Sequence, residues 1–220
     1  MGRALLFAAS VMVAFTTMRA AGQADPTAAR LLSGGVPAIP VQAVAGGEVL
    51  LSVTVSDAGR VGPIDALRTT PPFTDALVSA VRGWRFAPAE DAMRKPMASR
   101  VLVGAMFGAP TLNTPTVGEP AKDVAPAATA LPMPLTTGMP AYPPNARSAG
   151  IVMIETLVAA SGKVVGVTVV RSSPPFDEPS MEAARMWSFR PPQGPGVPPN
   201  TYAYLLFGFR PPVVGPAPGR

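Results

Sequence analysis

Residues 47–88, GEVLLSVTVSDAGRVGPIDALRTTPPFTDALVSAVRGWRFAP, recur without a gap as residues 150–191, GIVMIETLVAASGKVVGVTVVRSSPPFDEPSMEAARMWSFRP. Fourteen of the forty-two aligned positions are identical, including Gly59 with Gly162. The only two tryptophans of the chain, Trp84 and Trp187, occupy the same position of the repeat. A repeat of this length predicts one small supersecondary unit that is built twice.

The second copy shows how each unit is expected to fold. Residues 151–159 alternate along one better-buried face, and a turn around Gly162 leads to the β-branched run 164–170, which predicts a hairpin. An apolar stripe with acids early and Arg185 late predicts a helix over about 178–187. Residues 202–209 predict a third strand. The expected fold class is therefore α+β, with two tandem small domains that each have a three-stranded antiparallel sheet and a helix on one face.

Changes in composition suggest the domain boundaries. We expect a signal segment at 1–24, a first domain at 36–110, a second domain at 139–213 and a tail at 214–220. Residues 111–138 are rich in proline, alanine and threonine and have no periodic apolar pattern, which predicts an extended linker.

The N-terminal segment has the layout of a secretory signal. Arg3 precedes the apolar run 4–15, and small residues lie around Ala24. The run is shorter than the roughly 20 apolar residues of a bilayer span. Cleavage near Ala24 predicts a periplasmic protein, whereas retention of residues 1–24 predicts a protein anchored in the inner membrane.

Composition argues against an enzyme. The chain has no histidine and no cysteine, which removes the commonest proton-transfer side chain and the thiolate nucleophile. A strand-ending turn explains Ser172 and Ser173, and a helix cap explains Asp177 and Glu178, better than catalysis does. We expect no cofactor and no metal. The formal charge of +5 is spread rather than clustered, so no nucleic-acid partner is expected either.

The second copy resembles a known family. It opens with Tyr142-Pro143 and Ala146-Arg147, continues through Gly162 and Ser172-Ser173, and ends in Trp187, Phe189 and Pro191. This order and spacing resembles the C-terminal domain of the TonB family over about residues 139–211. The first copy keeps Gly59, Trp84, Phe86 and Pro88 and resembles a diverged second example, with Ile39-Pro40 in place of the opening motif.

The resemblance implies a partner and a mode of binding. TonB family members carry energy from an inner-membrane motor to outer-membrane receptors, and they pair a strand edge with a short extended receptor segment. The leading hypothesis is thus an exported TonB-like module that recognises an extended peptide of an outer-membrane receptor by edge-strand pairing, in TonB-dependent transport. The alternative is a passive periplasmic structural or interaction protein without energy transduction.

Two segments are candidates for peptide binding. The first contains Tyr142, Pro143 and Arg147, although Tyr142 could equally pack on the domain edge. The second is the third strand, which would bind a partner through its free main-chain groups if it lies at the sheet edge. The same edge could instead pair with the other copy or with another molecule. The residues named on this strand are Tyr202, Tyr204, Leu206 and Phe209.

Overall fold

A computed structural model describes residues 24–40, 43, 45–109, 117–118, 131–194 and 197–212. The expected signal segment, most of the expected linker and the tail lie outside these residues. The first part of the chain contains β1 (Arg30–Ser33), β2 (Gly47–Val55), β3 (Val61–Arg68), α1 (Phe73–Val81), β4 (Arg85–Ala87), β5 (Ala89–Glu90), β6 (Pro96–Met97) and β7 (Ser99–Phe107). The second part contains β8 (Val117–Gly118), β9 (Met133–Gly138), β10 (Gly150–Ala159), β11 (Val164–Arg171), α2 (Asp177–Met186), β12 (Ser188–Arg190) and β13 (Asn200–Phe209).

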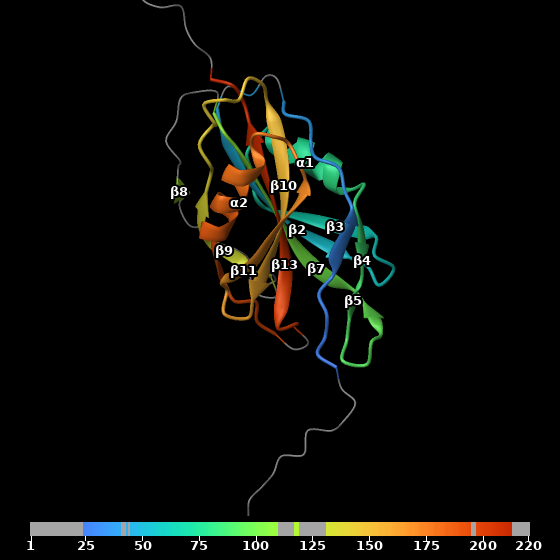
Figure 1. Cartoon of the computed structure of the whole chain (residues 1–220). Helices are drawn as coiled ribbons and strands as arrows, with labels where there is room; N and C mark the ends of the chain where they lie inside the picture. The colour runs from blue at the N-terminus through green and yellow to red at the C-terminus, as the bar shows by residue number, and fades with distance from the viewer. Residues whose placement is uncertain are drawn as a thin grey trace, which may run out of the picture.

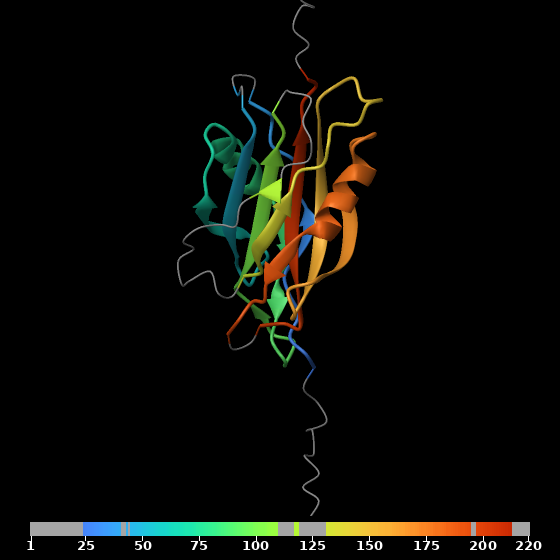
Figure 2. The ribbon, with the colours of Figure 1, turned by 90° about the vertical axis from the view of Figure 1, so that its left-hand side faces the viewer.

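The two copies share one sheet. Six strands hydrogen-bond in the order β11-β10-β13-β7-β2-β3, and β7 runs parallel to β13 at the centre. In Figure 2 the green β7 and the red β13 lie side by side and point the same way, with α1 to the left and α2 to the right. The mixed α and β content agrees with the expected class. Two separate three-stranded domains are not confirmed, because the third strands of both copies join into a continuous sheet.

Both faces of this sheet are buried. Along β10, Val152, Ile154 and Val158 lie in one core, as the alternating pattern predicts, but Met153 and Glu155 on the other face are buried too. The predicted face is the better buried one, since half-buried positions such as Leu157 lie on the opposite face, but that opposite face is largely buried as well. The second face is covered for a tertiary reason: α1 and α2 lie on opposite faces of the shared sheet (Figure 1), and Met153 of β10 lies in the core under α1.

The local turns repeat as the sequence predicts. Gly59 and Gly162 have φ values of +71° and +81°, and a Cβ at either position would come within 1.9 Å of a backbone carbonyl oxygen. Only glycine fits this conformation and this approach. Asp177 lies inside α2 rather than at its cap. Its carboxylate accepts hydrogen bonds from Ser172 Oγ and from the Ser173 N–H, which fixes the turn before the helix.

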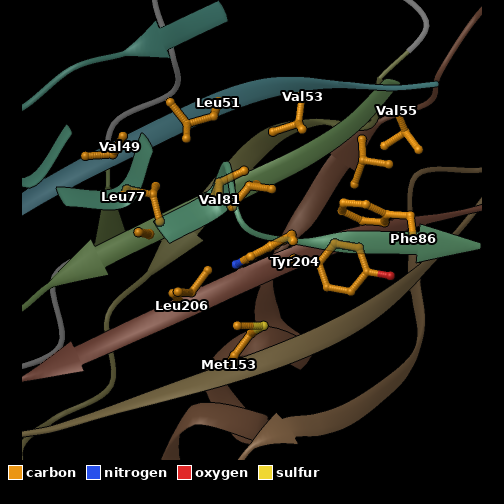
Figure 3. Close-up of a cluster of buried hydrophobic side chains, with 14 of the residues drawn as sticks. Val49, Leu51, Val53, Val55, Leu77, Val81, Phe86, Met153, Tyr204 and Leu206 are labelled. Carbon is orange, nitrogen blue, oxygen red and sulfur yellow. The ribbon is translucent and has the colours of Figure 1, made fainter. Parts of the chain in front are cut away.

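Each copy completes the other copy's core. The core under α1 contains Leu77, Val81 and Trp84 of the first copy, and it also contains Met153, Tyr204 and Leu206 of the second. Figure 3 shows these second-copy side chains in one cluster with Leu77 and Val81, and places Tyr204 beside Phe86. The core under α2 in turn contains Leu102 and Met106 of β7. Because β7 and β13 are parallel and the two cores lie on opposite faces, the copies are related by an approximate two-fold axis along the strands.

A further strand in each copy holds the tryptophan. β1 pairs with β4, and β9 pairs with β12, in equivalent places of the repeat. The Trp84 and Trp187 indoles are 0% and 3% exposed, and they donate hydrogen bonds to the carbonyl oxygens of Gly35 and Gly138. Both tryptophans are therefore core anchors. Residues 133–138, which were expected to belong to an extended linker, instead form β9, and the strand was missed because it is short and contains Pro134.

The shared cores predict that damage to one copy destabilises the other. Leu206→Ala, in the second copy, should lower the free energy of unfolding by about 2–5 kcal/mol because it leaves a cavity in the core under α1. Unfolding in urea should remain one transition, and amide exchange should accelerate in α1 as well as in β13. Leu135→Ala, at a 43% exposed position, is the control and should change stability by about 0.5 kcal/mol or less. Faster exchange confined to residues 139–212 would contradict the shared core.

Candidate functional site

The third strand of the second copy is not at an edge. β13 pairs with β10 along its whole length, from Asn200 to Phe209, and with β7 from Ala203 to Gly208. Of the alternatives left open for this strand, the structure shows pairing with the other copy, so the condition for free main-chain groups, a place at the sheet edge, is not met. The physical reason is that the first copy supplies an equivalent third strand, and pairing the two strands removes two exposed edges at once.

The side chains predicted on β13 are consequently not on one surface. Tyr204, Leu206 and Phe209 are at most 1% exposed. Tyr204 and Leu206 point into the core under α1, whereas Phe209 points into the core under α2. Tyr202 alone is half-buried. It lines a cavity of about 330 Å³ together with Thr27, Ala28 and Ser99, beside the N-terminal segment.

A polar cluster joins this N-terminal segment to the second copy. The Arg30 guanidinium donates to both oxygens of the Glu155 carboxylate, with N–O distances of 2.9–3.2 Å. The Tyr204 hydroxyl donates to Glu155 Oε2 at 3.2 Å and accepts the Leu31 N–H at 2.6 Å. Burial raises the pKa of Tyr204 well above its ordinary value, so the hydroxyl remains a donor. Sequence analysis missed Glu155 because its partner lies 125 residues earlier.

This cluster holds the N-terminal segment onto the sheet. Tyr204→Phe should leave the Leu31 N–H without its acceptor and should cost about 1–3 kcal/mol of stability. Residues 24–33 should then become sensitive to limited proteolysis before the rest of the chain. Tyr142→Phe, which removes a bond to the Ser148 carbonyl on the surface, is the control. Equal resistance of both variants and the parent at residues 24–33 would show that the cluster does not hold this segment.

Two of the predicted residues do lie together on the surface. Tyr142 and Pro143 line a groove of about 450 Å³ between the segment after β9 and helix α2. The opposite wall is formed by Pro179, Glu182 and Met186, and the Met186 side chain is 71% exposed. Arg147 is exposed and does not line the groove, so the structure does not bring it together with the other two.

The Tyr142 ring is held in place by aromatic packing and by a hydrogen bond. The Tyr142 ring packs against Phe176 at 5.5 Å, and Phe176 stacks on Phe209 at 4.3 Å. The Tyr142 hydroxyl donates to the Ser148 carbonyl oxygen at 2.9 Å, which fixes the ring. At the equivalent positions the first copy has smaller side chains, with Ile39 for Tyr142 and Gly83 for Met186. The two copies thus differ at two positions that line the groove, whereas Pro143 has the equivalent Pro40.

Nothing in the described part of the chain assembles a catalytic or metal centre. No group of three or more acidic side chains gathers there. Ser172 and Asp177 contact each other, but Asp177 also accepts a backbone N–H, and the pair stabilises a turn. Nor does any helix among these residues combine the length and the apolar character that a membrane span needs.

Comparison with known families identifies the second copy. Residues 139–211 match the family "Gram-negative bacterial TonB protein C-terminal". This segment, a third of the chain, is similar to a TonB C-terminal domain, and it contains Tyr142, Pro143, β10, β11, α2 and β13. No curated protein matches the chain. The match supports a non-catalytic, TonB-like role in the Gram-negative envelope and makes a protein partner plausible.

Proposed function

We propose that this protein is an exported, non-catalytic binding module of TonB-dependent transport that recognises an extended segment of an outer-membrane receptor by edge-strand pairing. In this proposal the first copy is a diverged TonB C-terminal domain. It acts as a permanent partner of the second copy's third strand. The observation that carries the proposal is the parallel pairing of β7 with β13, which leaves only the outer strands of the sheet for a peptide.

Replacement of β7 by a peptide would break many contacts between the two copies. Displacement would break the pairing of Leu102–Phe107 with Ala203–Gly208 and would remove Leu102 and Met106 from the core under α2. It would also break the bonds by which the Arg210 guanidinium, just after β13, donates to the Gly108 carbonyl oxygen at 2.8 and 3.0 Å. An extended segment that adds to an outer strand breaks none of these contacts.

The groove beside Tyr142 is a second contact surface in this proposal. An apolar side chain of the receptor segment would enter between Tyr142 and Met186, with Pro143 behind it. Arg147, exposed nearby in the chain, would remain outside the groove and act only through its charge. Tyr202, Tyr204, Leu206 and Phe209 would then support the fold rather than touch the peptide.

A disulfide that links β7 to β13 tests where the peptide binds. Leu102 and Ala203 are register partners across β7 and β13, and the chain has no native cysteine, so Leu102→Cys with Ala203→Cys gives one engineered disulfide. The oxidised variant should bind extended receptor segments as tightly as the parent, because the outer edges are unchanged. Titration followed by backbone amide shifts is the measurement, and the reduced variant is its matched control.

The outcomes separate three functions. Loss of binding on oxidation, with recovery on reduction, would show that the peptide displaces β7. Absence of binding to any receptor segment at millimolar concentration would favour the passive structural protein, for which the closed β7–β13 pairing is the supporting observation. Retention of residues 1–24 in the inner membrane, found by N-terminal sequencing, would favour energy transduction over a free periplasmic module.

A further inference from the structure

The two outer strands of the sheet, β3 and β11, differ in how readily they can pair with a further strand. β3, with the sequence VGPIDALR, contains Pro63, which has no N–H to donate, and the exposed Asp65. Both features discourage pairing at a sheet edge. The equivalent positions of β11, with the sequence VVGVTVVR, are Gly166 and Thr168. β11 has neither a proline nor an acid, and Val165 and Val170 are 58% and 40% exposed.

β11 also offers a regular stretch to a partner. Its register with β10 shifts near each end, and between the shifts Gly166–Val169 pairs residue by residue with Ile154–Leu157. Among the strands that the structure describes, none pairs with the outer side of β11 (Figure 2). Because the main-chain groups of an antiparallel strand point alternately to its two sides, alternate residues of this stretch are available to hydrogen-bond with an extended chain on the outer side.

Charge distinguishes the same two edges. On β3, Arg68 forms an ion pair with Glu48, and Asp65 lies 3.5 Å from Arg100. On β11 the residue equivalent to Arg68 is Arg171, and Ile151 replaces Glu48. Arg171 and Lys163, at the two ends of β11, are exposed, and neither has an ion pair within the described residues.

We infer that β11 is the receiving edge, and that it takes an extended segment of β-branched apolar residues with an acidic residue at each end. This inference rests on the proposed function and specifies its site and partner. The acids would face Lys163 and Arg171, while the main chain pairs with Gly166–Val169. A second copy of the protein fits less well, because antiparallel pairing of two β11 strands places Lys163 of one beside Arg171 of the other.

The test uses the full chain and a defined probe. The probe is a nine-residue peptide of alternating valine and threonine with a glutamate at each end, and its control has a lysine at each end. The glutamate peptide should protect the amides of Gly166–Val169 from exchange. The lysine peptide should bind about tenfold more weakly, and added salt should narrow this difference because the terminal charges are exposed.

Variants that transfer the β3 residues to β11 give the matched comparison. Gly166→Pro and Thr168→Asp should each weaken the probe about tenfold, by removing one main-chain donor or adding a repelling charge. A Cβ at Gly166 meets only Leu157, at 3.5 Å, so the position has room for a side chain. Thr168→Asp is an exposed substitution and keeps the test valid if Gly166→Pro does not fold. Asp65→Thr on β3 should leave the affinity within about twofold, because it does not touch β11.

Three results would overturn the inference. They are equal binding of both peptides, unchanged affinity of Thr168→Asp, and protection of β11 in the free protein that grows with protein concentration, which would indicate pairing between copies. If receptor segments still bind and shift Tyr142 and Met186 while Thr168→Asp has no effect, the proposed function stands and only the β11 site fails. If neither the probe nor any receptor segment binds, both fail.

Discussion

The parallel hydrogen bonding between β7 and β13 is the constraint on which the rest of the structure depends. A strand–strand–helix–strand unit of this kind covers one face of its sheet and leaves its third strand with one free side. Two such units related by a two-fold axis along the strands remove both the exposed face and the free strand side. Their third strands hydrogen-bond to each other, and the helix of each unit covers the face that the other leaves exposed.

Contacts at both ends of the central pair secure this arrangement. At one end, the Arg210 guanidinium donates to carbonyl groups of the first copy, including that of Gly108. At the other, Arg30 and Tyr204 meet at Glu155. Tyr204 also lies 6.0 Å from Trp84 and 5.9 Å from Phe86, so a second-copy side chain stands at the centre of the first copy's aromatic cluster. The halves therefore form one cooperative unit.

Closure of the sheet centre has a functional consequence. The third strand of the second copy, β13, is hydrogen-bonded on both sides by the molecule itself. Under the proposed function, recognition uses what remains accessible: the outer strand β11, and the groove that Met186 and Tyr142 form beside α2. The first copy has Pro63 at its outer edge and Gly83 in place of Met186, and so lacks the features of both surfaces. In the proposed function, the first copy supports the fold and the second copy contacts partners.

The sequence by itself determined the repeated unit, its turns and its anchors. Gly162 requires a conformation that only glycine adopts easily, and Trp187 with Phe189 requires a core, so these local features were predictable. The family of residues 139–211 was readable from the order and spacing of the same residues. Of the predicted site, Tyr142 and Pro143 proved to share a groove, whereas Tyr204, Leu206 and Phe209 proved to be buried. Only the tertiary structure decided this, because an alternating apolar strand reads the same at an edge and at the centre of a sheet. Whether the second side of β13 is hydrogen-bonded depends on β7, about one hundred residues earlier in the chain, and no local pattern encodes that pairing.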